Sequence, residues 1–453
     1  MKKHHSNRSM FSGKLGFVLS AAGASVGLGN IWRFPYLAAK YGGGIFLLIY
    51  ILLALTFGYT MIVAETSLGR MTRKSPVGAF ASFTKSHTLK VGGWINAIIP
   101  ILIVPYYSVI GGWVIKYLFE YICGNGTKLA EDGYFSMFIS DGMSAEICFV
   151  IFALITLTII FAGVRNGIER VSKFMMPILV VLSVIIAIYS VTRPGALKGI
   201  QYFLVPNLEN FSWMTVVSAM GQMFYSLSIA MGILVTFGSY MKKETSIEDS
   251  TRNVEVFDTA IAIMAGLMII PAVFAFSSGD PNTLQAGPSL MFITIPKVFA
   301  SMGLGTVVGI LVLFAAVTSS IALTESAVST FEDELHWNRK KSTVVIGIIM
   351  LALGTLSSLG YGPLDAVKIL GMQFLDFFDF LTNSVMMPIA AIATCLLVSR
   401  VIGVDRIEEE MTQEGGTFRR KKIFVMMIKY LCPVFAAIIL ISSVMNAFGL
   451  ISM

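Results

Sequence analysis

Long apolar segments recur along the whole chain, and they limit its possible folds more than any other feature. Crossing a bilayer requires about 20 mostly apolar residues, and eleven segments meet that length. Inside hydrocarbon every backbone polar group needs an internal partner, so such segments fold as helices. The sequence therefore predicts an all-α polytopic membrane protein, with spans centred near Ser25, Leu55, Tyr107, Leu154, Val181, Ser228, Ala265, Thr318, Met350, Ser384 and Ala437.

Composition supports this class and excludes others. Of 453 residues, 56% are hydrophobic and only 13% are charged, which is too apolar for a soluble domain. The net charge of +7 comes from loop clusters, so a nucleic-acid partner is not expected. The chain has no GxxxxGK[ST] motif and no evident nucleophile–base pair, so we expect neither nucleotide binding nor an enzyme. The four cysteines lack metal-site spacing, although Cys123 and Cys148 could pair.

The basic clusters orient the predicted spans. They alternate with loops poor in Lys and Arg, and they occupy residues 2–14, 70–90, 165–173, 242–252, 339–341 and 400–429. By the positive-inside rule, the N-terminus is cytoplasmic, and eleven spans then leave the C-terminus outside an inner (plasma) membrane. Residues 280–302, broken by Gly and Pro, are predicted as an external loop with short helices; the alternative is a twelfth span.

Two spans are interrupted at their centres, by Gly, Ser and Asn in residues 23–30 and by Ser and Gly in residues 226–232. They open two successive five-span blocks, about 10–192 and 214–400, and an extra helix follows at about 423–450. Because five is odd, the second block enters the membrane from the opposite side. The sequence therefore predicts one transmembrane domain, residues 1–453, made of two inverted five-helix repeats with broken helices 1 and 6.

The breaks also predict a binding site. A glycine in the middle of a helix costs about 1 kcal/mol relative to alanine, and three of them within seven residues favour unwinding. Unwound backbone survives at membrane depth only where something other than lipid satisfies it. Cations can bind its carbonyls, and a helix N-terminus can bind a carboxylate. The alternative is that Gly23 and Gly27 only allow two helices to pack closely.

Hydroxyl groups are concentrated in the same spans. Ser226 and Ser228 flank the second break, and three hydroxyls occur together at residues 318–320. Hard cations such as sodium prefer oxygen ligands. The alternative is that each hydroxyl donates to a carbonyl one turn earlier in its own helix.

Ionisable side chains inside spans are expensive and indicate function. Glu65 could lie at the membrane edge, accept a hydrogen bond from broken backbone, or act in transport. Asp258 could be a helix N-terminal acid or an ion ligand. The complete set is Arg33, Glu65, Asp258, Glu325, Asp376 and Asp379.

Four motifs together resemble those of the neurotransmitter:sodium symporters, in particular the bacterial branch. They are GASVGLGNIWRFP at 23–35, YGGG at 41–44, GQMFYSLS at 221–228 and TSS at 318–320. The resemblance covers almost the whole chain. It implies a leucine-transporter-like fold and sodium-coupled symport by alternating access.

The resemblance also implies roles for individual residues. Two sodium ions would bind at Gly23, Ser25, Val26, Asn30, Ser226, Asp258, Ala315, Thr318 and Ser319. The substrate would contact Ser25, Gly27, Leu28, Gly29, Ile103, Tyr107, Tyr225, Ser226, Ser228, Met231, Ser319 and Leu323. Arg33 and Asp379 would form the outer gate, and Arg8 and Asp333 the inner gate. Phe11 stands where relatives often carry tryptophan at the inner gate.

The implied substrates are hydrophobic L-amino acids, both aliphatic and aromatic. Carriers of amines have an aspartate where this chain has Gly27, so here the ligand must supply the carboxylate. Met231 is an adaptable pocket residue. Animal relatives bind chloride near the positions of Tyr50, Gln222 and Ser226, whereas Asp258 would here supply a fixed negative charge and remove the chloride requirement. The expected partners are thus an amino acid and the lipid bilayer. The alternatives are a proton-coupled carrier using Asp258 or Glu65, and a non-transporting receptor or channel.

Overall fold

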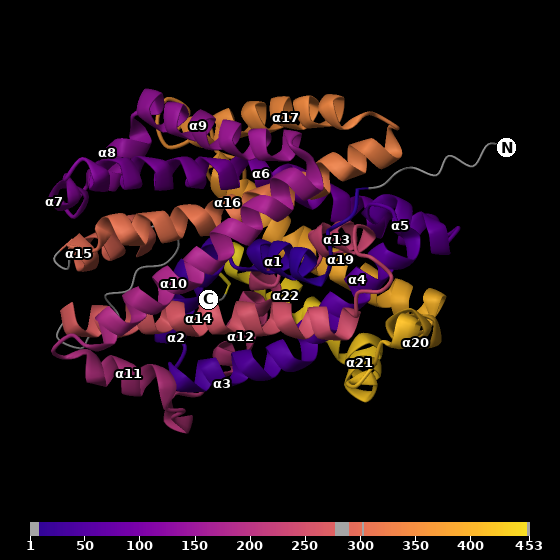
Figure 1. Cartoon of the computed structure of the whole chain (residues 1–453). Helices are drawn as coiled ribbons and strands as arrows, with labels where there is room; N and C mark the ends of the chain where they lie inside the picture. The colour runs from indigo at the N-terminus through magenta and orange to yellow at the C-terminus, as the bar shows by residue number, and fades with distance from the viewer. Residues whose placement is uncertain (1–8, 277–289, 301–302, 451–453) are drawn as a thin grey trace.

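The structure, a computed structural model, describes residues 9–276, 290–300 and 303–450, and Figure 1 shows that these fold almost entirely as helices. Arg8 therefore lies outside the described residues. The first predicted span consists of α1 (Lys14–Ser25), a π-helical turn (Gly29–Arg33) and α2 (Phe34–Lys40), with a bend of 53°.

Nine further helical segments in the described part of the chain are long and apolar enough to cross a membrane. They are Gly44–Thr72 (α3, Gly44–Leu53, and α4, Tyr59–Thr72), His87–Ile122 (α6), Gly142–Phe161 (α9), Val164–Val191 (containing α10, Arg170–Val191), Ile247–Ala275 (in α14, Ile247–Phe276), Gly305–Glu334 (α16), Arg339–Leu359 (α17), Phe374–Ile402 (containing α18, Phe374–Asp379, and α19, Met387–Leu396) and Lys421–Ala447 (α21, Lys421–Met426, and α22, Cys432–Ala447).

The remaining predicted span, centred on Ser228, contains two shorter helices, α12 (Trp213–Ser226) and α13 (Ile233–Ser239). All eleven predicted centres thus lie in helices or in the two expected breaks, which is consistent with eleven spans. Short helices connect the spans: α5 (Pro76–Phe83), α7 (Gly126–Leu129), α8 (Tyr134–Ser140), α11 (Ala196–Leu204), α15 (Ile295–Ala300) and α20 (Val404–Thr412). Within the predicted loop 280–302, residues 290–300 form short helices. Residues 280–289, 301 and 302 lie outside the described part of the chain.

The broken first span lies at the centre of the molecule (Figure 1). Its α1 packs against α10, α14 and α16, and ten of its twelve residues are buried. The peripheral helices instead expose large apolar side chains, such as Leu154 on α9 and Val181 on α10, which are 54% and 56% exposed. Such an apolar outer surface is suited to contact with lipid tails. The described cysteines are all free, so Cys123 and Cys148 do not pair.

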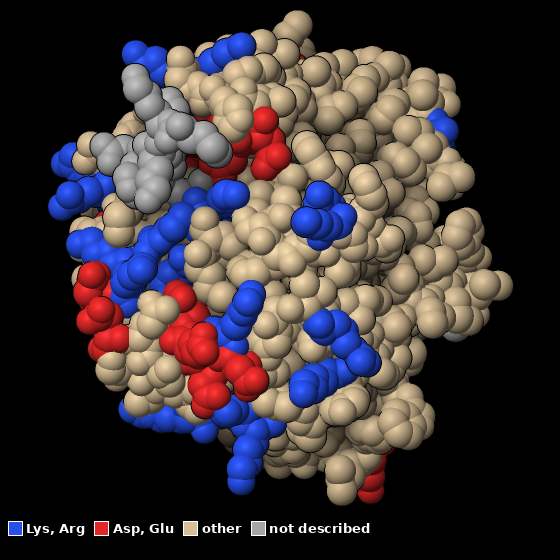
Figure 2. All heavy atoms as spheres, turned by 90° about the vertical axis from the view of Figure 1, so that its right-hand side faces the viewer, with Lys and Arg blue, Asp and Glu red and all other residues tan. Residues whose placement is uncertain are grey.

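Charged side chains gather at one end of the molecule, the end at which α5, α20 and α21 lie. Figure 2 shows blue and red groups crowded over part of this face, whereas the flank of the molecule in the same view is mostly uncharged. The predicted basic loops that follow α4 and α13 also end here (Figure 1). This is the face that the positive-inside rule assigns to the cytoplasm.

Several spans contain π-helical turns, each with one residue more than an α-turn. In the described part of the chain there are seven such segments: Gly29–Arg33, Ala54–Gly58, Val164–Glu169, Leu290–Thr294, Phe380–Met386, Leu397–Ile402 and Met427–Leu431. π-Helical turns inside α-helices are rare and frequently accompany functional sites. The first of them directly follows the break in span one.

Candidate functional site

The break in the sixth predicted span is held in an unusual backbone conformation. Ser228, Ala230 and Gly232 have φ angles of 54°, 59° and 70°, in the left-handed region. Only glycine adopts this region at no steric cost, so the surrounding structure must stabilise Ser228 and Ala230 there. Part of that support is a hydrogen bond from the Ser228 hydroxyl to the Ala24 carbonyl, 3.0 Å away in the first broken span. The two breaks therefore contact each other directly.

Glu65 provides a second support for this break. Its carboxylate is fully buried and accepts a hydrogen bond of 2.8 Å from the backbone N–H of Ala230. Of the three interpretations of Glu65, the hydrogen bond to broken backbone is the one that the structure shows, because the side chain lies in the protein interior beside the unwound segment.

We expect Glu65→Ala to destabilise the protein more than Glu65→Gln. Alanine leaves the buried N–H of Ala230 without an acceptor, which costs about 1–3 kcal/mol. Glutamine keeps a carbonyl oxygen in the position of the accepting carboxylate oxygen. The melting temperature of the purified protein measures the difference. Equal melting temperatures for the two variants would show that the negative charge, rather than the hydrogen bond, matters at this position.

Three polar side chains meet around Asp258 where the first, second, sixth and seventh predicted spans approach each other. The carboxylate oxygen Oδ1 accepts from Asn30 Nδ2 at 2.8 Å and from Ser226 Oγ at 2.7 Å, and Oδ2 accepts from Tyr50 OH at 2.9 Å. Asp258 lies in the interior of α14, which begins at Ile247. The interpretation of Asp258 as a helix N-terminal acid is therefore wrong. Carboxylate, amide and hydroxyl oxygens from separate helices form a donor set suited to a hard cation.

A second oxygen-rich cluster joins α1 to α16. Ser319 Oγ donates to the carbonyls of Gly23 and Ala24, at 3.3 and 3.1 Å. Thr318 Oγ1 lies 3.2 Å from the Ala315 carbonyl in its own helix. Val26, another residue predicted to bind sodium, is the C-cap residue of α1. Donation within the hydroxyl's own helix, the simpler alternative, thus holds for Thr318.

The same alternative fails for the serines. Ser226 donates to Asn30 and Asp258, Ser228 donates to Ala24, and Ser319 donates to α1, so all three reach across to other spans. Gly23 also allows the two helices to pack closely, as the alternative interpretation held, because a Cβ built there would lie 3.2 Å from Thr318 Cβ. Close packing and the oxygen cluster therefore occur at the same contact.

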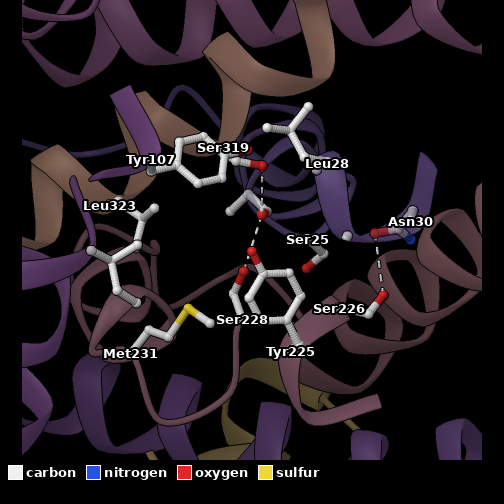
Figure 3. Close-up of a pocket in the computed structure, with 14 residues that line it drawn as sticks. Ser25, Leu28, Asn30, Tyr107, Tyr225, Ser226, Ser228, Met231, Ser319 and Leu323 are labelled. Carbon is white, nitrogen blue, oxygen red and sulfur yellow. Dashed lines mark hydrogen bonds between the residues drawn. The ribbon is translucent and has the colours of Figure 1, made fainter. Parts of the chain in front are cut away.

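A cavity lies between the two breaks, and Figure 3 shows the side chains that line it. Its lining contains every residue of the predicted substrate set, together with Ala24 and Asn30. Met231 and Leu323 lie on one side of the cavity, whereas Ser25, Asn30 and Ser226 lie on the opposite side (Figure 3). The cavity is therefore apolar at one end and rich in oxygen atoms at the other.

Two glycines, Gly27 and Gly29, allow the backbone of the first break to line this cavity. A Cβ on Gly27 would lie 2.5 Å from Ser319 Oγ and 3.4 Å from the Tyr107 hydroxyl, and a Cβ on Gly29 would lie 2.5 Å from the Tyr225 ring. Any larger residue would thus collide with the opposite wall. The backbone of the first break consequently forms part of the cavity surface.

The predicted outer gate lies beyond Tyr225. Arg33 and Asp379 line a second cavity of about 350 Å³, and the Arg33 guanidinium lies 5.1 Å from the centre of the Tyr225 ring. Asp379 accepts from Tyr106 OH at 3.3 Å and Asn383 Nδ2 at 2.5 Å. Among the described residues, no ion pair within 4.0 Å joins Arg33 to Asp379. The two gate charges therefore face one cavity without closing it as a salt bridge.

The inner side is packed more tightly. Phe11 is buried and makes edge contacts with Phe17, Phe237 and Tyr240, so it fills its site as an aromatic residue. Asp333 accepts from the backbone N–H of Ser75 at 2.5 Å. Its predicted gate partner Arg8 is outside the described residues. The inner pair is therefore not described.

Sequence reasoning missed the charge partner of the buried Glu325. Its Oε2 pairs with Arg339 Nη2 at 2.5 Å, and its Oε1 accepts from Tyr240 OH at 2.7 Å. Arg339 belongs to a loop cluster, where nothing local distinguishes it from Lys340. Ala24 was missed as a lining residue because only its backbone contributes a polar group.

Comparison with known proteins agrees with this architecture. The model of the sodium:neurotransmitter symporter family matches residues 8–127 and 137–450. The uncharacterized sodium-dependent transporter YhdH of Bacillus subtilis is 33% identical over 452 residues, 98% of each chain. The human sodium- and chloride-dependent GABA transporter 2 is 26% identical over 478 residues, which cover 90% of this chain and 75% of the relative.

Among solved structures, the crystal structure of MhsT in complex with L-phenylalanine matches with a TM-score of 0.86 and 34% identity. The match covers 96% of this chain and 100% of MhsT. The fold is thus the leucine-transporter-like fold that the motifs implied. The family model covers far more than half of the residues, and the matched ranges include both breaks. The chain is therefore a membrane transporter that belongs to the sodium:neurotransmitter symporter family.

Proposed function

We propose that the protein is a symporter that imports hydrophobic L-amino acids, aliphatic and aromatic, together with sodium ions. The observation that carries the proposal is the cavity between the two breaks, with an apolar wall at one end and oxygen groups at the other. An amino acid has a matching division between its side chain and its charged backbone groups. The family and the phenylalanine-bound MhsT structure support sodium-coupled amino acid transport.

In this proposal two sodium ions bind beside the cavity. The first is held by the Ser25 carbonyl and by the side chains of Asn30, Ser226 and Asp258. These three side chains already form one hydrogen-bonded cluster. The second uses the carbonyls of Gly23, Val26 and Ala315 with the hydroxyls of Thr318 and Ser319. Chloride is not required, because the Asp258 carboxylate supplies the negative charge.

The substrate carboxylate is proposed to meet the backbone of Gly27–Gly29, the Tyr107 hydroxyl and the first sodium ion. Its side chain would lie against Ile103, Met231 and Leu323. Met231 is unbranched and flexible, so the wall can adapt to side chains of different shape. Discrimination per methylene is then expected to be only about 1–3 kcal/mol.

Transport would follow from alternating access around this site. The two inverted repeats, about 10–192 and 214–400, would rock against each other. Arg33 and Asp379 would control access from outside, and Arg8 and Asp333 access from the cytoplasm. The protein would lie in the plasma membrane with its N-terminus inside and its C-terminus outside.

The experiment that tests this proposal is uptake into proteoliposomes with either a sodium gradient or a choline control, at the same pH on both sides. Each hydrophobic amino acid is offered in turn. We expect accumulation only with the sodium gradient. Buried carboxylates at Asp258 and Glu65 also suit a proton-coupled carrier. Accumulation driven by a pH gradient without sodium would favour that rival.

A second prediction concerns the carboxylate of the substrate. Tryptamine has the side chain of tryptophan but no carboxylate, and this chain has Gly27 where an acidic residue would be needed to replace it. We therefore expect tryptophan to inhibit labelled amino acid uptake at concentrations where tryptamine does not. Inhibition curves in sodium buffer measure this difference. Equal inhibition would contradict the assignment of the cavity's polar end.

A further inference from the structure

A groove separate from the central cavity runs between α3 and α14 toward the segment that precedes α21. Its volume is about 570 Å³, larger than that of the outer cavity. Most of its wall is apolar and comes from the second and seventh predicted spans, whereas its other end carries charges. The wall residues are Ile51, Ala54, Leu55, Val256, Thr259, Ala260 and Ile263, and the charged residues are Glu248, Asp249, Arg252, Glu255, Arg419 and Arg420.

The acidic residues of the groove already have partners within the protein. Arg420 forms an ion pair with Glu255 at 2.8 Å and lies 3.8 Å from Glu248. It also stacks on Tyr59, 3.7 Å from the ring centre, and the Tyr59 hydroxyl donates to Glu248. These contacts use both buried carboxylates. They also fix the segment before α21 against α4 and α14, so the groove is built from rigid elements.

Two further cations, Arg252 and Arg419, lie at the same end. Asp249 pairs with Lys14 at 3.6 Å. Among the residues that the structure describes, Arg252 and Arg419 make no hydrogen bond and no ion pair within 4.0 Å, and Arg252 interacts with Glu255 only at longer range. Both arginines are exposed. Three carboxylates (Glu248, Asp249 and Glu255) face four cations (Lys14, Arg252, Arg419 and Arg420), so the net charge at the mouth of the groove is 4 − 3 = +1. The two exposed guanidinium groups bind phosphate oxygens well.

The depth of the groove corresponds to half a bilayer. Arg252 and Ile263 are on the same helix, and at 1.5 Å per residue their separation is about 16 Å. The hydrocarbon core of a bilayer is about 30 Å thick. The groove thus runs from the charged face, which the positive-inside rule assigns to the cytoplasm, to about the middle of the membrane.

We propose that this groove binds an anionic glycerophospholipid of the cytoplasmic leaflet. Arg252 and Arg419 bind the phosphate of the headgroup, and one acyl chain lies along the apolar wall formed by Leu55, Val256 and Ile263. A free phosphate would make no use of that wall, and a zwitterionic lipid such as phosphatidylcholine would bring its cationic choline group next to the two arginines, which offsets the attraction of its phosphate. Because the groove joins the second and seventh spans to the segment before α21, the lipid connects parts of the fold distant in sequence.

The test measures lipid binding to the full-length protein in a neutral detergent by native mass spectrometry. The probes are phosphatidylglycerol, phosphatidylcholine with the same acyl chains, and glycerol 3-phosphate. The first variant, Arg252→Gln/Arg419→Gln, removes the two exposed guanidinium charges of the groove. The second, Ala260→Trp, fills the groove and keeps them. The matched control, Lys340→Gln/Arg400→Gln, removes two exposed charges from the same face outside the groove.

We expect the wild-type protein to bind one phosphatidylglycerol with at least about tenfold higher affinity than phosphatidylcholine, since each basic residue strengthens anionic-lipid binding. The double arginine variant should lose this preference, the control should keep it, and Ala260→Trp should weaken both lipids. Equal affinity for the two lipids in the wild type would overturn the proposal. So would an equal loss in the control, or displacement of the lipid by equimolar glycerol 3-phosphate.

Discussion

Asp258→Asn is expected to reduce sodium-driven uptake in chloride-free buffer by at least about 100-fold. The carboxylate accepts hydrogen bonds from Asn30, Tyr50 and Ser226 through its two oxygens. An amide cannot accept on both sides, and its NH₂ group would face one of these donors. Removing one partner from a buried charged network costs about 3–5 kcal/mol. The same change removes the fixed negative charge proposed to balance the first sodium ion.

The measurement is initial uptake in proteoliposomes with gluconate or with chloride as the only anion. Asp405→Asn makes the identical chemical change at an exposed position on α20 and serves as the control. Recovery of Asp258→Asn by chloride would support the charge-balancing role. If its uptake equals that of the wild type in gluconate, Asp258 has no part in sodium binding. Gel filtration of both variants checks that they fold.

Gly69→Ala is expected to lower the melting temperature by several degrees, because the added methyl group would clash with the backbone of a facing helix. A Cβ on Gly69 would lie 1.9 Å from the Val235 carbonyl oxygen and 2.8 Å from the Ser239 backbone nitrogen. On the facing helix, a Cβ on Gly238 would lie 2.4 Å from the Thr66 carbonyl oxygen. The helices α4 and α13 thus touch backbone to backbone, as helices in membranes do through small residues.

Overpacking usually costs about 1–3 kcal/mol, and here the obstructing atoms are backbone, which cannot rotate away. Gly221→Ala is the matched control, because it adds the same methyl group inside α12 with no atom within 4 Å. That variant should be as stable as the wild type or slightly more so, since alanine favours helices over glycine by about 1 kcal/mol. Equal melting of the two variants would show that α4 and α13 can separate at little cost.

The parts of this architecture that the sequence predicts are those with a local cause. Apolar length predicts the spans, and the glycines of residues 23–30 predict the first break, because both act on the residues that carry them. The second break was also predicted, but its left-handed positions include Ser228 and Ala230, where composition alone would favour glycine. Their conformation depends on Glu65 and Ala24, which belong to other spans.

The pairings between spans have no such local cause. Tyr50 and Asp258 are 208 positions apart, and Arg420 and Glu255 are 165 apart. Each of these side chains could have paired with many other polar residues of the chain, so composition and periodicity do not identify its partner. The substrate-site residues were identified from a family pattern and not from their spacing, and they line one cavity. Helix packing in three dimensions determines the rest.

The π-helical turns have an evolutionary consequence. A π-turn holds one residue more than an α-turn, so deleting one residue there restores an ordinary helix and keeps both flanking faces in register. The same deletion in an α-helical turn rotates everything beyond it by about 100°. In the second predicted span, Ala54–Gly58 separates α3, which contains Tyr50 of the Asp258 cluster, from α4, which contains Gly69 of the close helix contact. Descendants of this chain can therefore lose a residue at that turn without disturbing either contact, and the two halves of one helix can diverge independently.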